Sequence, residues 1–503
     1  GLRIYYTICD SRVILLGNKE LLQIKDFLMT ASPLNTNWIN HRLKEYILGY
    51  DIDFYKLFSL LKTQFTNCYF LESLSLPRHQ DRYYTIGFDP DLIFAAKNNK
   101  LSLSGEAATI AITTGLKDRT EVTYEVDNPY EFLRNQFDFK ADCDPHQGGL
   151  IGYVCHEAVN YFEPSLNLTE HDDFSTFKFG LYTDGLLYDT TTGTLTYYYF
   201  YKDRSEQIKS ILANLDSYEI PTELESVKFT GHSVTKEEFI KSVNVTKEKI
   251  RQGYSFQAEV GFKSHYEIKG DKLAIYNKLR QINPSPYMFY IKFDQEELLG
   301  ASPEILISCK QSMVLTTPTA GTTVRGKSSA EDVQLARKLL SDPKEIAEHN
   351  MLVDLHRNDI SKICHPGTVK ISDLMYIIKF SHVQHIVSDV VGFLAKKKNA
   401  FDVLATILPG GVVTGAPKIE TIKIIDENEN TPRGPYGGAV GRFSFSGDCD
   451  FCLPIRSIFC YGDKCYAQTS AGVVYDSVPE KEYAEVTHKL AAMKQTLEEL
   501  SGN

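Results

Sequence analysis

The sequence has no long hydrophobic run and no excess of basic residues. None of its 503 residues lies in an uninterrupted apolar stretch of the roughly 18 that a transmembrane helix needs. Lys and Arg number 54 against 65 Asp and Glu, a net charge of −11, which disfavours a nucleic-acid-binding surface. No basic segment followed by an apolar one opens the chain. We therefore expect a cytoplasmic protein that contacts neither membrane nor nucleic acid.

Several catalytic fingerprints are also missing. The chain contains no Gly-x-Gly-x-x-Gly, no phosphate-binding Gly-x-x-x-x-Gly-Lys-Ser/Thr and no Gly-x-Ser-x-Gly elbow. Internal repeats and low-complexity tracts are absent too. These absences argue against a nucleotide-dependent enzyme and a serine hydrolase. Hydrophobic residues make up 43% and charged residues 24%, as in ordinary globular proteins.

Cysteines are sparse, ten in all, but four of them cluster near the C-terminus. Cys449 and Cys452 are followed by Cys460 and Cys465, a spacing that leaves a zinc site open. The turn 461–464 predicts a hairpin that sets Cys460 beside Cys465. We favour buried, free cysteines in adjacent strands over zinc, because a chain without a secretion signal keeps its thiols reduced.

Aromatic and β-branched runs separated by turn residues, such as Thr194–Tyr201, predict a largely antiparallel sheet. A polar stretch over 216–232 reads as a linker. A helix is predicted over Lys236–Gln252, capped by Thr235 or Ser233. The fold class is therefore α+β: an antiparallel, sandwich-like β core with helices packed outside, in two intertwined subdomains. We place a boundary between an N-terminal region, 1–230, and a second domain, 231–503.

Two predicted helices begin with acidic residues. Asp342 and Ser477 are suitable N-caps, each followed by a proline and a capping-box glutamate. Each helix then carries a Glu-x-x-Glu pair on one face. The pairs are Glu345 with Glu348, and Glu482 with Glu485. Opposed pairs would supply hard oxygen ligands for Mg²⁺. The alternative is that these acidic residues only stabilise helix N-termini.

Glycine-rich turns recur through the second half of the chain and could expose backbone N–H groups to carboxylates. They include 318–322, 409–411, 414–418 and 436–441. Arg456 adds a bidentate donor, and His385 is a possible acid–base group. Glycines at sheet corners and a core histidine are the alternatives.

In their order and residue identities these segments resemble those of the chorismate-utilising enzymes, and among them most closely the large subunits of anthranilate synthases. The segments that carry the resemblance are Asn283–Phe289, Gly300–Glu304, Pro318–Thr322, Met351–Asp359, Ser381–His385, Thr414–Lys418, Tyr436–Gly441 and Asp476–Glu480. The resemblance covers about residues 235–495 strongly and the N-terminal half weakly. It identifies 231–503 as the chorismate-binding catalytic domain and 1–230 as a regulatory or structural part.

The resemblance also implies roles for particular residues. Glu304 matches the general acid that protonates the departing ring hydroxyl, and His385 the histidine tied to pyruvate elimination. The magnesium ligands would be Glu348 and Glu485, and Glu345 and Glu482 would support the ion through waters. The substrate-binding positions are Gly321, Thr322, Tyr436, Arg456, Ala471, Gly472 and Lys489.

Siblings in the family differ in the nucleophile that they add. Those that use water carry a lysine base at the position of Gln257, and glutamine cannot deprotonate water. The 4-amino-4-deoxychorismate synthases often carry a lysine at the position of Ala320, so a covalent route is closed here. The resemblance therefore implies that this chain makes anthranilate and pyruvate from chorismate and ammonia, the first committed step of tryptophan biosynthesis. A 4-amino-4-deoxychorismate synthase or another chorismate-utilising synthase is the alternative, and a non-enzymatic homologue a more distant one.

Three departures from the family pattern stand out. Val412 replaces a threonine, Thr469-Ser470 replaces Ala-Gly, and 258–261 reads Ala-Glu-Val-Gly in place of a more apolar run ending in serine. They could alter affinity or mark a diverged lineage.

A partner and a regulator follow from the same resemblance. The chain has no Gly-x-Cys-x-Gly glutaminase turn, so ammonia is expected from a separate glutamine amidotransferase subunit. Family members often bind tryptophan as a feedback inhibitor between a Leu-Glu-Ser run and an Asn-Pro-Ser-Pro-Tyr-Met-Phe run. Here the binding residues would be Ser73, Pro286, Tyr287 and Met288, whose apolar and aromatic surface suits an indole ring. The alternative is that this run only shapes a turn before a strand.

Overall fold

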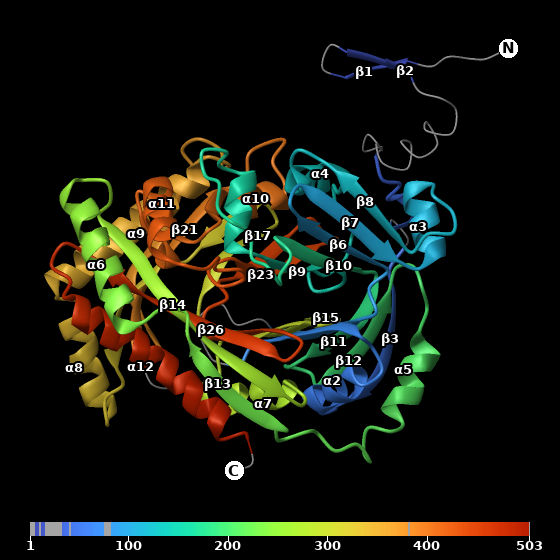
Figure 1. Ribbon diagram of the computed structural model, residues 1–503. Coiled ribbons are helices and arrows are strands. Elements are labelled where there is room, and N and C mark those ends of the chain that lie inside the picture. Colours follow the sequence, from blue (N-terminus) through green and yellow to red (C-terminus); the bar gives the residue numbers. More distant parts are fainter. Residues whose placement is uncertain are drawn as a thin grey trace.

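Two large antiparallel sheets face one another in the computed structural model, with helices on their outer sides and ends (Figure 1). The structure describes residues 33–39, 42–74, 82–380 and 383–501, and the backbone of β1 (Tyr6–Cys9) and β2 (Arg12–Leu15). Each large sheet has twelve strands, and their pairings are antiparallel.

We call the sheets upper and lower, after their places in Figure 1. In hydrogen-bonded order the upper sheet contains β19 (Thr319–Val324), β21 (Val383–Phe393), β18 (Met313–Thr316), β17 (Ile305–Lys310), β24 (Cys449–Cys452), β23 (Ala439–Ser444), β9 (Gly149–Val154), β10 (Phe177–Tyr182), β6 (Leu92–Lys97), β7 (Lys100–Gly105) and β8 (Glu121–Glu125), with β20 (Lys370–Lys379) added on β21. The lower sheet contains β13 (Ser226–His232), β14 (Gln257–Lys269), β26 (Lys464–Val473), β25 (Ser457–Tyr461), β16 (Glu296–Ser302), β15 (Tyr287–Phe293), β4 (Asn67–Glu72), β5 (Tyr83–Phe88), β11 (Asp184–Asp189), β12 (Thr194–Tyr199) and β3 (Lys44–Tyr50), with β22 (Gly415–Ala416) added on β14.

The helices join these strands and cover the sheets from outside. They are α2 (Phe54–Lys62), α3 (Ala107–Thr114), α4 (Pro129–Gln136), α5 (Ser205–Leu212), α6 (Lys236–Arg251), α7 (Leu273–Ile282), α8 (Ser329–Leu339), α9 (Pro343–Ser361), α10 (Ala400–Ile407), α11 (Lys418–Asn428) and α12 (Pro479–Glu498). Short 3-10 turns lie at Asn37–Ile39, His156–Tyr161 and Gly411–Val413.

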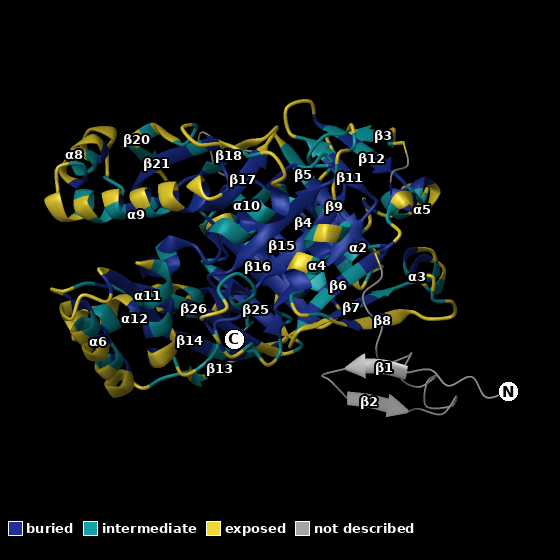
Figure 2. Ribbon diagram, turned by 90° about the horizontal axis from the view of Figure 1, so that it is seen from above, coloured by how far each residue is buried: buried dark blue, intermediate teal, exposed yellow. Residues whose placement is uncertain are grey.

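Strand β15 shows why the lower sheet is buried on both faces. Successive side chains of a strand point to opposite faces. Phe289 and Ile291 pack into the core shared with the upper sheet, whereas Met288 and Tyr290 pack into a second core with outer helices such as α2 and α7. Figure 2 shows the resulting buried centre, with exposed residues concentrated on the outer helices.

The predicted α+β class with an antiparallel, sandwich-like core and intertwined halves is confirmed. Both sheets mix strands from either side of residue 230; β9 pairs with β23, and β4 with β15. The boundary at residue 230 stays a prediction. No helix in the described ranges is both long enough and apolar enough to cross a membrane.

Three local expectations need correction. Part of the supposed linker, Ser226–His232, is strand β13, because it pairs along β14 and partly covers alternate residues. Ser477 does not cap α12; its hydroxyl accepts the Val474 N–H at 3.0 Å, and the helix starts at Pro479. Asp342 does cap α9, accepting N–H groups of Lys344 and Glu345.

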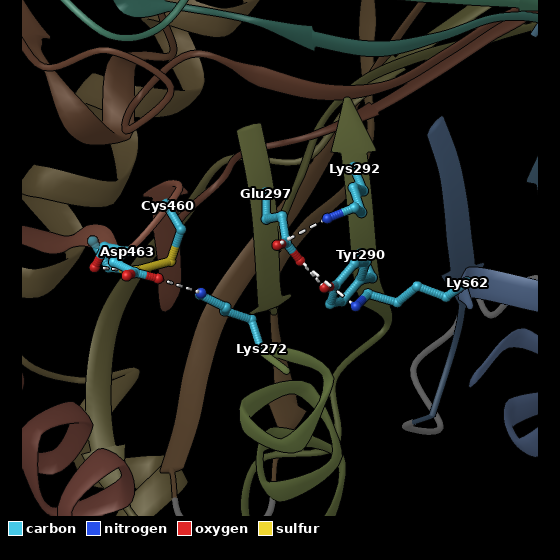
Figure 3. The surroundings of a disulfide bond; sticks show 8 residues. Lys62, Lys272, Tyr290, Lys292, Glu297, Cys460 and Asp463 are labelled. Atoms are coloured by element: carbon cyan, nitrogen blue, oxygen red, sulfur yellow. Dashed lines mark hydrogen bonds and ion pairs between the residues drawn. A yellow bond between two sulfur atoms is a disulfide. The ribbon is translucent and has the colours of Figure 1, made fainter. Parts of the chain in front are cut away.

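The third correction concerns the cysteines. Cys449 and Cys452 are buried and free, but Cys460 and Cys465 form a disulfide. The predicted hairpin makes them directly opposite partners in β25 and β26, which brings their sulfurs together. Figure 3 shows this end of the lower sheet, where Lys272 reaches Asp463 beside the disulfide.

Candidate active site

The predicted catalytic residues gather where the same end of both sheets is flanked by α9 and α12. The upper sheet contributes β19 and β21, and the lower sheet contributes β14 and β26. Figure 2 shows α9 with β21 on one side of this end and α12 with β14 on the other. Residues more than 200 positions apart in sequence therefore meet at one place.

Glu304 lies in the turn between β16 and β17 and is only 5% exposed. Burial raises the pKa of its carboxyl well above the usual value, against the opposing effects of the Arg456 charge and a hydrogen bond from the Thr319 backbone. A raised pKa favours the protonated carboxyl, which can donate its proton to a leaving group.

His385, on β21, lies close to the same arginine. Its Nδ1 is 2.9 Å from Thr322 Oγ1, and its Nε2 has no hydrogen-bond partner among the described residues. Burial, with the Arg456 charge second, lowers the pKa of His385 to about 4. The imidazole is therefore neutral at pH 7 and can accept a proton.

Gly321 lies within β19, at the place where the strand packs against α9. Its φ of +79° is in the left-handed region, and a Cβ there would lie 3.1 Å from Glu345 Oε2. A glycine thus allows the strand to turn while the Glu345 carboxylate approaches its backbone. The neighbouring Thr322 is exposed.

The two predicted carboxylate pairs lie in the first two turns of α9 and α12. Burial raises the pKa of Glu345, and the Glu348 charge adds to the effect. Burial likewise raises the pKa of Glu482, with Glu485 adding and a hydrogen bond from Ser477 opposing. Lys344 lowers the pKa of both Glu345 and Glu482, which places the two helix starts near one another.

These carboxylates do not form a closed metal cage. Within the described ranges, no group of three or more His, Cys, Asp or Glu side chains is placed to hold a metal ion. Glu485 is half-exposed and paired with Lys489 at 2.7 Å. Lys489 also donates to the Ser470 carbonyl at 3.0 Å, which ties α12 to β26.

Gln257 is the first residue of β14, and its side chain contacts Glu348 on α9. Its Nε2 donates to Glu348 Oε1 at 3.1 Å and to Glu259 Oε1 at 3.2 Å. Gly472, opposite Glu259 in β26, leaves the space for this arrangement.

The remaining predicted substrate-binding residues differ in the group that each can offer to a substrate. Tyr436 is buried, and its hydroxyl lies 3.0 Å from Ser470 Oγ. Arg456 is partly exposed and makes no side-chain hydrogen bond within the described ranges, so its guanidinium is available to an anion. The Ala471 side chain packs in the outer core of the lower sheet, so only its backbone can face the site.

Sequence reasoning assigned no role to Glu259 or Ser470, which the structure places beside Gln257. Glu259 could have been found by strand periodicity, because it lies two residues after Gln257 and so shares its face of β14.

The predicted regulatory residues meet elsewhere, between the two sheets. β4 and β15 pair with Glu72 opposite Met288. Ser73, Pro286, Tyr287 and Met288 line one pocket. The upper sheet completes its wall with Val440, Gly441, Arg442, Asp450 and Cys452.

Comparisons with known proteins agree with this architecture. A sequence model for the family described as chorismate binding enzyme matches residues 50–495. Anthranilate synthase component 1 of Leptospira biflexa is 41% identical over 453 residues, 90% of this chain and 95% of that protein. The protein of the same name from Methanothermobacter thermautotrophicus is 37% identical, over 88% of this chain and 92% of its own length.

Solved structures give the same picture. Anthranilate synthase component I from Streptococcus pneumoniae TIGR4 has a TM-score of 0.70 and 30% identity, covering 84% of this chain and 94% of that one. The menaquinone-specific isochorismate synthase of Escherichia coli, at 18% identity and a TM-score of 0.68, covers 95% of this chain and 98% of its own and shares the fold.

Proposed function

Because the chain belongs to the chorismate-binding enzyme family, we propose that it converts chorismate and ammonia to anthranilate and pyruvate. The observation that supports this most directly is Gln257. Where water-using siblings would carry a lysine base, its amide instead donates to two carboxylates. An amide cannot remove a proton from water, so the nucleophile that suits this site is ammonia, which needs no base to attack.

In the first step, the ammonia lone pair forms a C–N bond while the ring C–O bond breaks. The oxygen leaves as water with the proton of Glu304. The new ammonium group then loses one proton, and Glu304 is reprotonated through solvent. In the second step, a ring C–H proton is removed, the ether C–O bond breaks, and protonation of the departing methylene carbon gives pyruvate. Neutral His385 suits the proton-accepting role in this step.

Magnesium is the cofactor that we propose, held by Glu348 and Glu485 with Glu345 and Glu482 in support. The donors are hard oxygens. Burial raises the pKa of Glu345 and Glu482, like charge within each pair adds to the effect, and a cation would relieve that repulsion. When bound, the ion supplies positive charge for a substrate carboxylate. Arg456 supplies a second positive charge from the chain itself.

The direct test is to incubate the protein with chorismate, ammonium and magnesium and follow anthranilate fluorescence. We expect anthranilate to accumulate. Accumulation of an amino-chorismate without pyruvate would instead favour the 4-amino-4-deoxychorismate synthase alternative, against which Ala320 argues because it has no amine for a covalent route.

Ammonia in the cell would come from a separate glutamine amidotransferase subunit. We expect the isolated chain to use ammonium but not glutamine, and glutamine-dependent turnover to appear when that subunit is added. Anthranilate synthesis with glutamine as the sole nitrogen source is the measurement. Glutamine turnover by the isolated chain would contradict the proposal. The cytoplasmic location expected from the sequence stays a prediction.

We further propose that the pocket lined by β4 and β15 of the lower sheet and by β23 and β24 of the upper sheet binds tryptophan as a feedback inhibitor. Its wall includes Pro286 and Tyr287, whose apolar and aromatic surface suits an indole ring. Arg442 is only 7% exposed, and no hydrogen bond or ion pair joins its guanidinium to a described residue. A buried guanidinium in this wall suits the ligand's carboxylate.

Ser73→Ala should weaken tryptophan inhibition about tenfold, because the amino-acid head group loses one hydrogen-bond partner. Met288→Thr should act in the same direction, because it loosens the packing in the outer core directly behind this wall. The measurement is the tryptophan concentration that halves the ammonia-dependent rate. Ser102→Ala, on β7 far from the pocket, is the control. A wild-type rate unmoved by millimolar tryptophan would end this proposal and leave the catalytic one intact.

A further inference from the structure

A polar chain links β14, β26 and the Tyr436 turn beside the proposed ammonia site. Glu259 Oε2 accepts a hydrogen bond from Ser470 Oγ at 2.7 Å, and Tyr436 OH lies 3.0 Å from the same oxygen of Ser470. Because the Ser470 hydrogen is directed to the carboxylate, Tyr436 donates to Ser470. Glu259 and Ser470 are both positions at which the sequence departs from the family pattern. Neither has a role in the reaction as described above.

The other oxygen of Glu259 fixes the direction of the Gln257 amide. Gln257 Nε2 donates both to Glu259 Oε1 at 3.2 Å and to Glu348 Oε1 at 3.1 Å. A carboxylate oxygen accepts and does not donate, so the amide nitrogen must face the two glutamates. The carbonyl oxygen of Gln257 then points away from them. Within the described ranges it accepts no hydrogen bond.

Gly472 keeps space open beside this amide. A Cβ at Gly472 would lie 2.7 Å from Gln257 Nε2 and 2.7 Å from Glu259 Oε1, and the glycine itself is partly exposed. A side chain there would separate Gln257 from Glu259. The bare backbone therefore permits the contact that orients the amide.

We propose that Glu259 is a positioning residue: together with Glu348 it holds the Gln257 amide so that its carbonyl oxygen receives an N–H of ammonia. The inference rests on the proposed function. A nucleophile that donates through N–H keeps its lone pair free, and an acceptor of fixed direction aims that lone pair at the ring. Ser470 and Tyr436 hold Glu259 itself in place.

The test compares two substitutions of Glu259. Valine removes the acceptor and leaves the Gln257 amide held by Glu348 alone, whereas glutamine can still accept from Gln257 Nε2 through its carbonyl oxygen. Valine suits a strand position, so Glu259→Val is expected to fold. Glu267→Val is the matched control, because Glu267 lies on the same strand but its carboxylate only approaches Lys269 at the surface.

Steady-state rates of anthranilate formation are measured against ammonium at saturating chorismate, and against chorismate at saturating ammonium. Glu259→Val should raise the KM for ammonia about tenfold, the effect of one charge-assisted hydrogen bond. Its KM for chorismate should stay within about twofold, and Glu259→Gln should recover most of the loss. A merely structural role would move both KM values together.

Two results would overturn the inference alone. One is a KM for ammonia in Glu259→Val within twofold of wild type; the other is equal impairment of Glu259→Gln and Glu259→Val, which would assign the effect to charge and not to amide orientation. An inactive wild-type protein would overturn the proposed function, and this inference with it.

Discussion

Glu304→Gln should lower kcat for anthranilate formation by about 10³-fold, because glutamine fills the same space but has no proton to give. Burial raises the pKa of Glu304 well above its usual value, which favours the protonated acid. The rate should fall as pH rises through that pKa, since the protonated form is the active one. In the glutamine variant this alkaline decline should disappear from the residual rate. Rate–pH profiles of both proteins are the measurement.

Glu296→Gln is the control for this substitution. Glu296 is also only 5% exposed, and it lies at the opposite end of β16, bonded to Tyr153 and Lys178. It should change stability but leave kcat within about twofold. If Glu304→Gln keeps near-normal activity, the departing hydroxyl takes its proton from another group.

Glu348→Gln and Glu485→Gln should each raise the magnesium concentration needed for half-maximal activity by about 100-fold. Each substitution removes one anionic oxygen ligand and keeps the shape of the side chain. If the ion binds the folded protein, added magnesium should raise Tm in the wild type and much less in the variants. Activity and Tm are both titrated with magnesium.

The matched control lies on the same helix. Glu498 pairs with Lys494 across one turn of α12, as Glu485 pairs with Lys489, but at the far end of the helix. Glu498→Gln should leave both titrations unchanged. An unaltered magnesium response in both Glu348→Gln and Glu485→Gln would show that the carboxylate assignment is wrong.

Local features were predictable from the sequence where one segment determines them. Asp342 before Pro343 correctly placed the start of α9, and Thr235 with Glu238 forms the capping box that starts α6. Ser477 failed as a cap although its pattern is similar, because its hydroxyl is taken by the Val474 N–H. The start of α12 was nevertheless predicted to within one residue, because Pro479 and Glu480 favour the first helical turn.

The contacts across the site were not predictable from spacing. That Gln257 meets Glu348, and Glu259 meets Ser470, depends on how β14 pairs with β26 and where α9 lies against them. The order of motifs indicated that such residues converge, but gave no hydrogen bonds. The Cys460–Cys465 disulfide was missed for a different reason: the hairpin was predicted, but the redox state was inferred from the expected cellular location and not from geometry.

The most direct test of the proposed activity is a product analysis with isotopically heavy ammonium, chorismate and magnesium, without glutamine. The reaction predicts anthranilate that carries the heavy nitrogen, together with an equal amount of pyruvate. Isochorismate without incorporated nitrogen, or an aminated chorismate with no pyruvate, would contradict it.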